Sequence, residues 1–180
     1  MRRLPFILSI ILLACLVIPA CEVENCPPNT LSYAHFALVD QYGRGVQITD
    51  TITVIGQTRA DVENASGETV QDSLLADTII NRENGVESLK LPLSYSDETS
   101  FIIIYHSLQH TYAGRDTIRI SHKNIPYFTN LDCGTMMFYT VTETHFTHHQ
   151  LDSLVITNPN IDNNEKENFK LYFTVSGTAE

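Results

Sequence analysis

The sequence predicts an all-β fold, an antiparallel β-sandwich that is immunoglobulin-like in the broad sense. Two observations lead to this prediction. No stretch after the first thirty residues shows sustained helical periodicity. That part of the chain instead contains about eight or nine short runs of alternating or continuous apolar residues, which turn-forming residues separate. The chain of 180 residues is also long enough to bury a core in one domain.

The N-terminus has the features of a processed export signal. Two arginines open it, an almost wholly apolar run covers residues 4–17, and Ala20 precedes Cys21. This run is shorter than the roughly 20 residues that a transmembrane helix needs. The pattern resembles a bacterial lipoprotein signal peptide, which is cut before a cysteine that then carries palmitate. We therefore predict a signal peptide over 1–20, a tether lipidated at Cys21 over 21–30, and a β-sandwich domain over 31–180.

Other interpretations of this segment remain open. Cleavage before Cys15 would leave an apolar region of only about 10 residues, near the low end of the usual range. A plain secretory signal and an uncleaved anchor are further alternatives. A twin-arginine signal is disfavoured because the flanking residues of that motif are absent.

The charge of the chain disfavours some classes of partner. It has 11 basic and 21 acidic side chains, which give a net charge of −10 at pH 7. Such a surface repels phosphate backbones, so we expect no nucleic-acid partner. It also disfavours adhesion to anionic lipid, so the lipid anchor must supply the membrane attachment. The simplest role of the charge is solubility.

The cysteines predict one disulfide. Of the four, Cys15 would leave with the signal peptide and Cys21 would be acylated. Cys26 and Cys133 remain as a pair in an oxidising compartment. A bridge between them would close a loop of roughly 100 residues, worth about 4.7 kcal/mol in the chain-entropy model. Two separate buried thiols are the alternative.

Local patterns place the strands of the first half. Residues 46–55 carry apolar side chains on one parity, as a half-buried strand does. Residues 57–72 are polar and contain Asn64 and Gly67, so we expect a long exposed loop there. Turns are predicted at 41–45 and 82–85. The predicted strands of this half cover 33–40, 46–55, 73–81 and 86–93.

The second half contains the most apolar strand. Residues 101–105 form a continuous apolar run, which predicts a central strand covered on both faces. After a turn at 112–114, residues 117–121 alternate cleanly and would form a hairpin with it. Residues 158–168 are polar and predict a loop. The remaining predicted strands cover 125–129, 136–144, 151–157 and 169–175.

Several short motifs resemble one family. They are the lipobox cysteine with a second cysteine close behind it, ESLKLPL at 87–93, the acidic turn at 97–98, the apolar strand at 101–105, RDTIRI at 115–120, Cys133-Gly134, and NFKLYF at 168–173. In these motifs the chain resembles a family of small lipoproteins of unknown function found in Bacteroidota. The resemblance covers nearly the whole mature chain. It implies an envelope location and a β fold with paired cysteines, and it implies no activity.

Histidines are the first candidates for chemistry. His145, His148 and His149 lie close together, and His106 and His110 come earlier. Three or four neutral imidazoles can bind Zn²⁺ or Cu²⁺. In an extended strand, however, His148 would point away from the other two, so one site would need a bend. Polar histidines at a strand end are the simpler interpretation, and we predict no metal.

Other catalytic patterns are missing from the sequence. The Asn- and Asp-rich stretch 158–165 lacks the spacing of a calcium loop, and turns use the same residues. No nucleophile elbow, carboxylate pair, phosphate loop or dinucleotide fingerprint occurs. We therefore expect a non-enzymatic, cofactor-free binding or structural accessory anchored by lipid in the cell envelope. The alternative is a metal-binding or hydrolytic envelope protein that uses the His145–His149 group.

One tripeptide recurs. Asp followed by Ser or Thr and then an apolar residue occurs five times, and it matches an O-glycosylation sequon of exported Bacteroidota proteins. The candidate acceptors are Thr51, Thr117, Thr78, Ser73 and Ser153. Thr51 and Thr117 precede isoleucines that look core-facing, so strand parity predicts that both face solvent. The alternative is that Asp ends a turn and the next residues begin a strand.

Two glutamates shortly after Cys21 resemble the acidic surface-export signal of Bacteroidota lipoproteins. We therefore expect an outer-membrane lipoprotein, on either the periplasmic or the surface face. Its expected partners are the membrane, through the lipid, and an envelope protein or a glycan.

Overall fold

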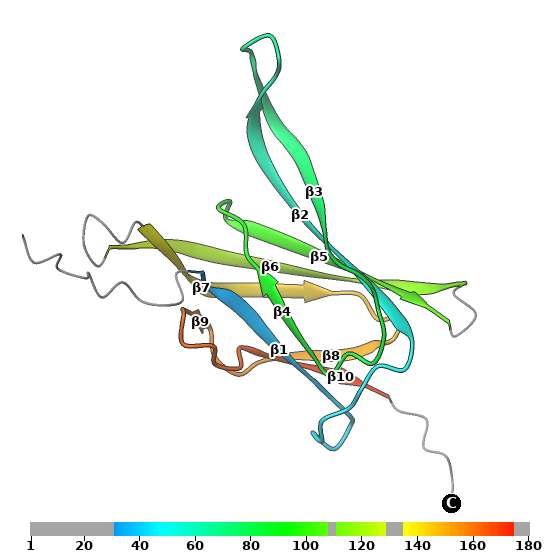
Figure 1. Cartoon of the computed structure of the whole chain (residues 1–180). Coiled ribbons are helices and arrows are strands. Elements are labelled where there is room, and N and C mark those ends of the chain that lie inside the picture. The colour runs from blue at the N-terminus through cyan, green and yellow to red at the C-terminus, as the bar shows by residue number, and fades with distance from the viewer. Residues whose placement is uncertain (1–30, 108–110, 129–134, 175–180) are drawn as a thin grey trace, which may run out of the picture.

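The computed structural model describes residues 31–107, 111–128 and 135–174. These residues form ten strands (Figure 1). They contain no helix that is long and apolar enough to span a membrane. The strands are β1 (Tyr33–Val39), β2 (Thr51–Glu63), β3 (Thr69–Glu83), β4 (Ser88–Pro92), β5 (Glu98–His106), β6 (Tyr112–Phe128), β7 (Thr135–Phe146), β8 (Leu151–Ile156), β9 (Asn160–Ile161) and β10 (Phe169–Phe173).

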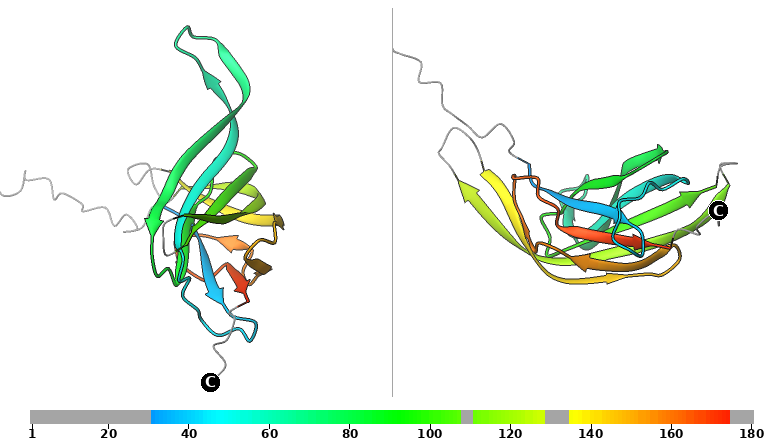
Figure 2. Two further views of the ribbon diagram at one scale, coloured as in Figure 1. Left: turned by 90° about the vertical axis from the view of Figure 1, so that its right-hand side faces the viewer. Right: turned by 90° about the horizontal axis from the view of Figure 1, so that it is seen from below.

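The strands form two sheets that pack face to face (Figure 2). One sheet has the order β4-β1-β10-β8 and the other has the order β3-β2-β5-β6-β7-β9. Aromatic rings join them: Phe36 of β1 stacks on Phe169 of β10 at 4.6 Å and meets Phe101 of β5 edge-on at 6.1 Å. All three rings are buried in a core to which both sheets contribute. The predicted all-β sandwich is confirmed.

One strand pair departs from the antiparallel pattern. β1 and β10, the first and last strands of the described residues, pair in parallel with Phe36 opposite Phe169. Because a parallel pair needs a long crossover, it joins segments that are far apart in sequence. The whole of the intervening domain makes this connection.

The long loop predicted over 57–72 is wrong, because β2 and β3 run through that stretch as a hairpin. Neither face of its outer part packs on the core, so the sequence shows no apolar alternation to mark it. The predicted strand at 46–55 begins only at Thr51, and the turn predicted at 112–114 lies inside β6.

The apolar run at 101–105 was predicted to be a central strand, and β5 lies in the interior of its sheet, between β2 and β6. Its apolar run is nevertheless covered on one face only. Phe101, Ile103 and Tyr105 are fully buried, whereas Ile102 and Ile104 are half-buried. The prediction of burial on both faces is wrong because the second sheet packs on only one face of the strand.

Candidate functional site: the β2–β3 arm

The outer half of the β2–β3 hairpin extends away from the sandwich (Figures 1 and 2). β2 pairs with β5 only as far as Gln57, which lies opposite Ser100. From Thr58, which lies opposite Leu75, β2 pairs with β3 alone. We call residues 58–75 the arm. The hydrophobic core of the described residues includes no residue of the arm.

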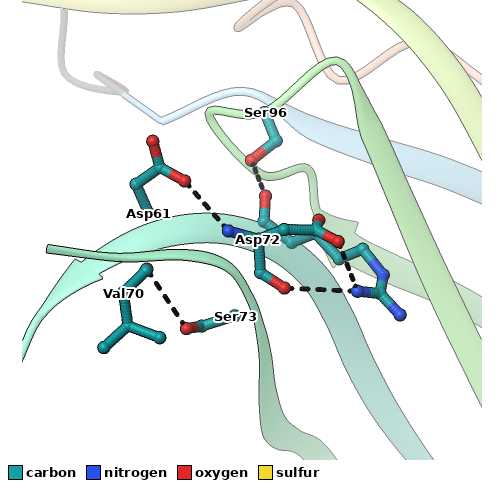
Figure 3. A network of polar contacts seen from close by, with 6 residues as sticks. Asp61, Val70, Asp72, Ser73 and Ser96 are labelled. Atoms are coloured by element: carbon teal, nitrogen blue, oxygen red, sulfur yellow. Dashed lines mark hydrogen bonds and ion pairs between the residues drawn. The ribbon is translucent and has the colours of Figure 1, made fainter.

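Side-chain hydrogen bonds brace the arm near its base (Figure 3). Arg59 Nη1 donates to Asp72 Oδ2 at 2.8 Å, and the Asp72 amide donates to Asp61 Oδ1 at 3.0 Å. Ser96, in the β4–β5 connection, donates from Oγ to the Arg59 carbonyl at 2.6 Å. Asp72 has a φ of 54°, next to a shift in strand register. The arm is therefore a braced extension of the sheet, with a bulge that sets its twist.

The tip of the arm is an ordered turn. Asn64 Oδ1 accepts hydrogen bonds from the amides of Ser66 and Glu68, both at 2.9 Å. Gly67 has a φ of 79°, which glycine adopts at little cost, and its amide donates to the Asn64 carbonyl. The Asn and Gly that suggested a loop thus form a hairpin turn.

The arm exposes apolar side chains among acidic ones. Val70, Leu74 and Leu75 are 47%, 57% and 43% exposed. The arm carries four acidic side chains and one basic side chain, Arg59. Arg59 is already paired with Asp72. Leu74 and Leu75 are successive strand residues, so they lie on opposite faces of the arm. Exposed apolar side chains with a polar rim are typical of a protein interaction site.

A cavity of about 290 Å³ lies where the arm leaves the body. Leu75, Asp77 and Ile79 of β3 line one side of it, and the end of β4 at Pro92 and Leu93 lines the other. A Cβ at Gly56 would lie 2.8 Å from Ile79 Cδ1, so glycine allows Ile79 to pack here. The surface of the arm thus continues into a mostly apolar hollow.

A polar cluster is centred on the buried side chain of Asp116 in β6. Asp116 is fully buried and accepts hydrogen bonds from three successive amides, those of His149 (2.6 Å), Gln150 (2.8 Å) and Leu151 (3.0 Å). The hydroxyl of Thr147 also donates to it, at 2.9 Å. The carboxylate therefore fixes the β7–β8 connection onto β6. Asp116 lies on the same face of the strand as the core residues Ile118 and Ile120, so the sequence could have predicted that Asp116 is buried.

Comparison with known proteins identifies the family of the chain. A model described as a family of unknown function (DUF6452) matches residues 66–173, more than half of the chain. The chain belongs to the DUF6452 family. The match runs from the tip of the arm to the end of β10, and it leaves β1 and β2 before its start. No curated protein and no solved structure matches the chain.

The predicted histidine group has separate local roles in this DUF6452 protein. His145 Nε2 lies 3.1 Å from Glu143 Oε1, and the His148 ring meets the Phe146 ring edge-on. His149 Nε2 lies 2.9 Å from the Ala113 carbonyl oxygen. In the parts of the chain that the structure describes, no three His, Cys, Asp or Glu side chains are placed to hold a metal ion.

The tripeptide acceptors differ in exposure. Thr51 is only 5% exposed, so the prediction that it faces solvent is wrong. The rule that successive strand residues alternate between core and solvent does not hold at the start of β2, where Thr51 and Ile52 are both buried. Thr117 is half-buried, as are Ser73 and Ser153, whereas Thr78 is exposed. Accessibility therefore favours Thr78 among the five.

The lipidation and disulfide predictions concern other parts of this family member. Cys21, Cys26 and Cys133 lie outside the described residues, as do the signal peptide and the tether.

Proposed function

We propose that this DUF6452 protein is a non-enzymatic, lipid-anchored accessory of the bacterial cell envelope that binds its partner through the arm. The observation that carries the proposal is the braced arm itself. It projects from the sandwich and presents Val70, Leu74 and Leu75 to solvent. These side chains contribute nothing to the core, so their exposure has no role in folding the domain.

Energetics favour a binding role for the arm. Each Å² of apolar surface removed from water contributes about 25 cal/mol, so a partner that covers these three side chains would gain several kcal/mol. The bracing hydrogen bonds fix the arm before binding, which lowers the conformational entropy that association loses. A rigid apolar projection is thus suited to insertion into a groove of another protein.

A pair of double variants tests the arm. Leu74→Ser with Leu75→Ser should abolish co-purification of an envelope partner from the native host. The control is Val155→Ser with Ile156→Ser, which removes two similarly exposed apolar side chains from β8 on the other sheet. Equal loss of the partner from both variants, or from neither, would refute the arm as the contact surface.

The leader sequence supports the anchor. The positive start, the short apolar run and the Ala20-Cys21 junction are typical of an acylated lipoprotein, and Glu22 and Glu24 resemble the export signal of surface lipoproteins. Labelled palmitate should be incorporated by the native chain and not by Cys21→Ser. Protease treatment of intact cells then distinguishes the two faces, because a periplasmic domain is protected and a surface domain is cut.

A further inference from the structure

The arm belongs to a strand with an open edge. β3 is the outermost strand of the six-stranded sheet, and within the described residues only β2 pairs with it. It is 15 residues long, well above the usual strand length. An edge strand of this length presents a row of backbone N–H and C=O groups that can pair with another chain.

Little along β3 protects that edge. Proteins usually block an exposed edge with lysine, proline or a bulge. β3 contains no lysine and no proline, and its register against β2 shifts next to Asp72 and again between Thr78 and Glu83. Its two residues with positive φ, Asp72 and Arg82, lie near its ends. Between them, residues 73–81 carry a single charged side chain, Asp77. This nine-residue segment has the composition of a strand that accepts a neighbour.

We propose that residues 73–81 of β3 bind an extended, positively charged segment of the envelope partner, which adds to the sheet as a seventh strand. The inference rests on the proposed function and names the kind of partner. In strand addition, main-chain hydrogen bonds give affinity and pockets for alternate side chains give specificity. The cavity beside Leu75, Asp77 and Ile79, alternate residues of β3, is placed to receive such side chains.

Charge decides between this partner and a second copy of the chain. Four carboxylates lie on the arm, Asp77 follows at its base, and the whole chain carries −10. Two copies would bring like charges together across the new strand pair, which destabilises it. A basic segment would instead complement the surface and bind faster.

Hydrogen exchange with a defined peptide tests the inference. The probe is a synthetic undecapeptide that alternates valine and threonine and carries three lysines, and the control peptide has glutamates in their place. The lysine peptide should slow exchange of alternate amides within 73–81 of the full-length protein by about tenfold or more, because those amides gain hydrogen bonds. The glutamate peptide should not.

Two single variants place the contact at the edge. Ala76 of β3 and Gln57 of β2 lie directly opposite each other and therefore share one face of the hairpin. Lysine at position 76 lies on the edge strand, whereas lysine at 57 lies one strand further in. Ala76→Lys should weaken binding of the lysine peptide by about tenfold, and Gln57→Lys should weaken it by less than about twofold.

Three results obtained with the peptide would overturn the inference. They are the absence of binding by the lysine peptide, binding without protection of residues 73–81, and equal weakening by the two lysine variants. Protection of 73–81 that rises with protein concentration in the absence of peptide would overturn it in favour of a second copy. If one of these results occurs while the variant with Leu74→Ser and Leu75→Ser still loses its envelope partner, strand addition is refuted and the proposed function stands.

Discussion

Single polar residues hold distant segments of this sandwich together. Asp116 lies on β6 and accepts three successive amides from the β7–β8 connection, more than 30 residues away. His122 occupies a similar position further along β6. Its ring lies between the Thr99 hydroxyl and the Asn124 side chain, at 2.9 and 2.8 Å. Both side chains are buried, so their loss affects folding directly.

Asp116→Ala should lower the free energy of unfolding by about 3 kcal/mol, because it leaves three amides, of which that of Leu151 is buried, and a hydroxyl without their acceptor. Urea denaturation measures the change. The matched control is Asp77→Ala, which begins the same Asp-Thr-Ile tripeptide at an exposed position and should change stability by less than about 0.5 kcal/mol. Equal effects of the two substitutions would contradict a special role for Asp116.

Hydrogen-bond geometry assigns the protons of His122. Asn124 Nδ2 donates to the carbonyls of Tyr95 and Ser96, so its Oδ1 is the acceptor that faces His122 Nδ1. Nδ1 therefore carries the proton, and Nε2 lies 2.9 Å from Thr99 Oγ1. Burial lowers the pKa of His122, although the hydrogen bond to Asn124 and the nearby carboxylates of Asp97 and Glu98 act in the opposite direction.

This shift predicts loss of stability in mild acid. The folded-state pKa of His122 lies below its unfolded value of about 6.5, so protonation favours the unfolded chain. Stability is complete above about pH 6.5 and falls as the pH drops below it. Burial, followed by Lys90, also lowers the pKa of His35, which adds to the same trend. The urea midpoint should fall between pH 7.5 and 5.5. His122→Gln should reduce that slope, and the exposed control His145→Gln should not.

Exposure decides which tripeptide can be modified. If the native protein carries O-glycan, it should lie on Thr78 and be absent from the buried Thr51. Mass spectrometry of peptides from the native host locates it. Thr78→Ala should remove the sugar mass, whereas Thr51→Ala should leave it. A glycan found on Thr51 would contradict this assignment.

At the scale of elements, the arm is separable from the body. Its bracing contacts are polar and lie at the surface, and none of its residues enters the core. Short hairpins close well through Asn-Gly in a two-residue turn. The opposed residues Gln57 and Ala76 offer a suitable point for such a turn.

Replacement of residues 58–75 by Asn-Gly should leave a folded sandwich. We expect the free energy of unfolding to change by less than about 1 kcal/mol, because no buried apolar contact is lost. Thermal unfolding followed by circular dichroism measures this. A control that replaces the buried Leu89 of β4 by Ala should lower stability by about 2–5 kcal/mol. Collapse of the arm-deleted protein would show that the arm is part of the folding unit.

The alternation of apolar and polar residues predicted the strands that have one buried face. β4 alternates buried Leu89 and Leu91 with exposed neighbours, and the sequence showed this clearly. The arm could not be predicted in this way, because both its faces meet solvent and its apolar residues show no sustained alternation. For the same reason the candidate site escaped notice, whereas the histidines drew attention through their chemistry alone. Strand alternation predicts that Asp116 is buried, but it does not predict that the β7–β8 connection supplies the amides that Asp116 accepts from.

At the scale of the whole molecule, strand partners cannot be read from local patterns. Nothing in β1 or β10 indicates that they pair in parallel across 133 residues. The remaining long-range prediction is the Cys26–Cys133 bridge. Leu31 and Thr135 line one cavity of about 220 Å³, so the chain comes together five residues after Cys26 and two residues after Cys133. Both cysteines themselves lie outside the described residues, so the bridge stays a prediction.

The bridge has a direct test. Non-reducing peptide mapping of the native protein should recover Cys26 and Cys133 in one linked peptide. Cys26→Ser should lower the free energy of unfolding by about 2–5 kcal/mol, since it releases a large loop in the unfolded chain. Reduction of the native protein should have the same effect and should not change the Cys26→Ser variant. Two free thiols in the folded native protein would contradict the pairing.

The pairing of β1 with β10 also governs when the domain can fold. β1 lies between β4 and β10, so its place in the sheet is complete only after the last strand is present. A chain that crosses a membrane N-terminus first must therefore pass almost entirely through the channel before its sandwich can close. Late closure keeps the polypeptide in a form that a narrow translocation pore accepts. It also means that a nascent chain truncated before residue 169 reaches the far side without a completed sheet.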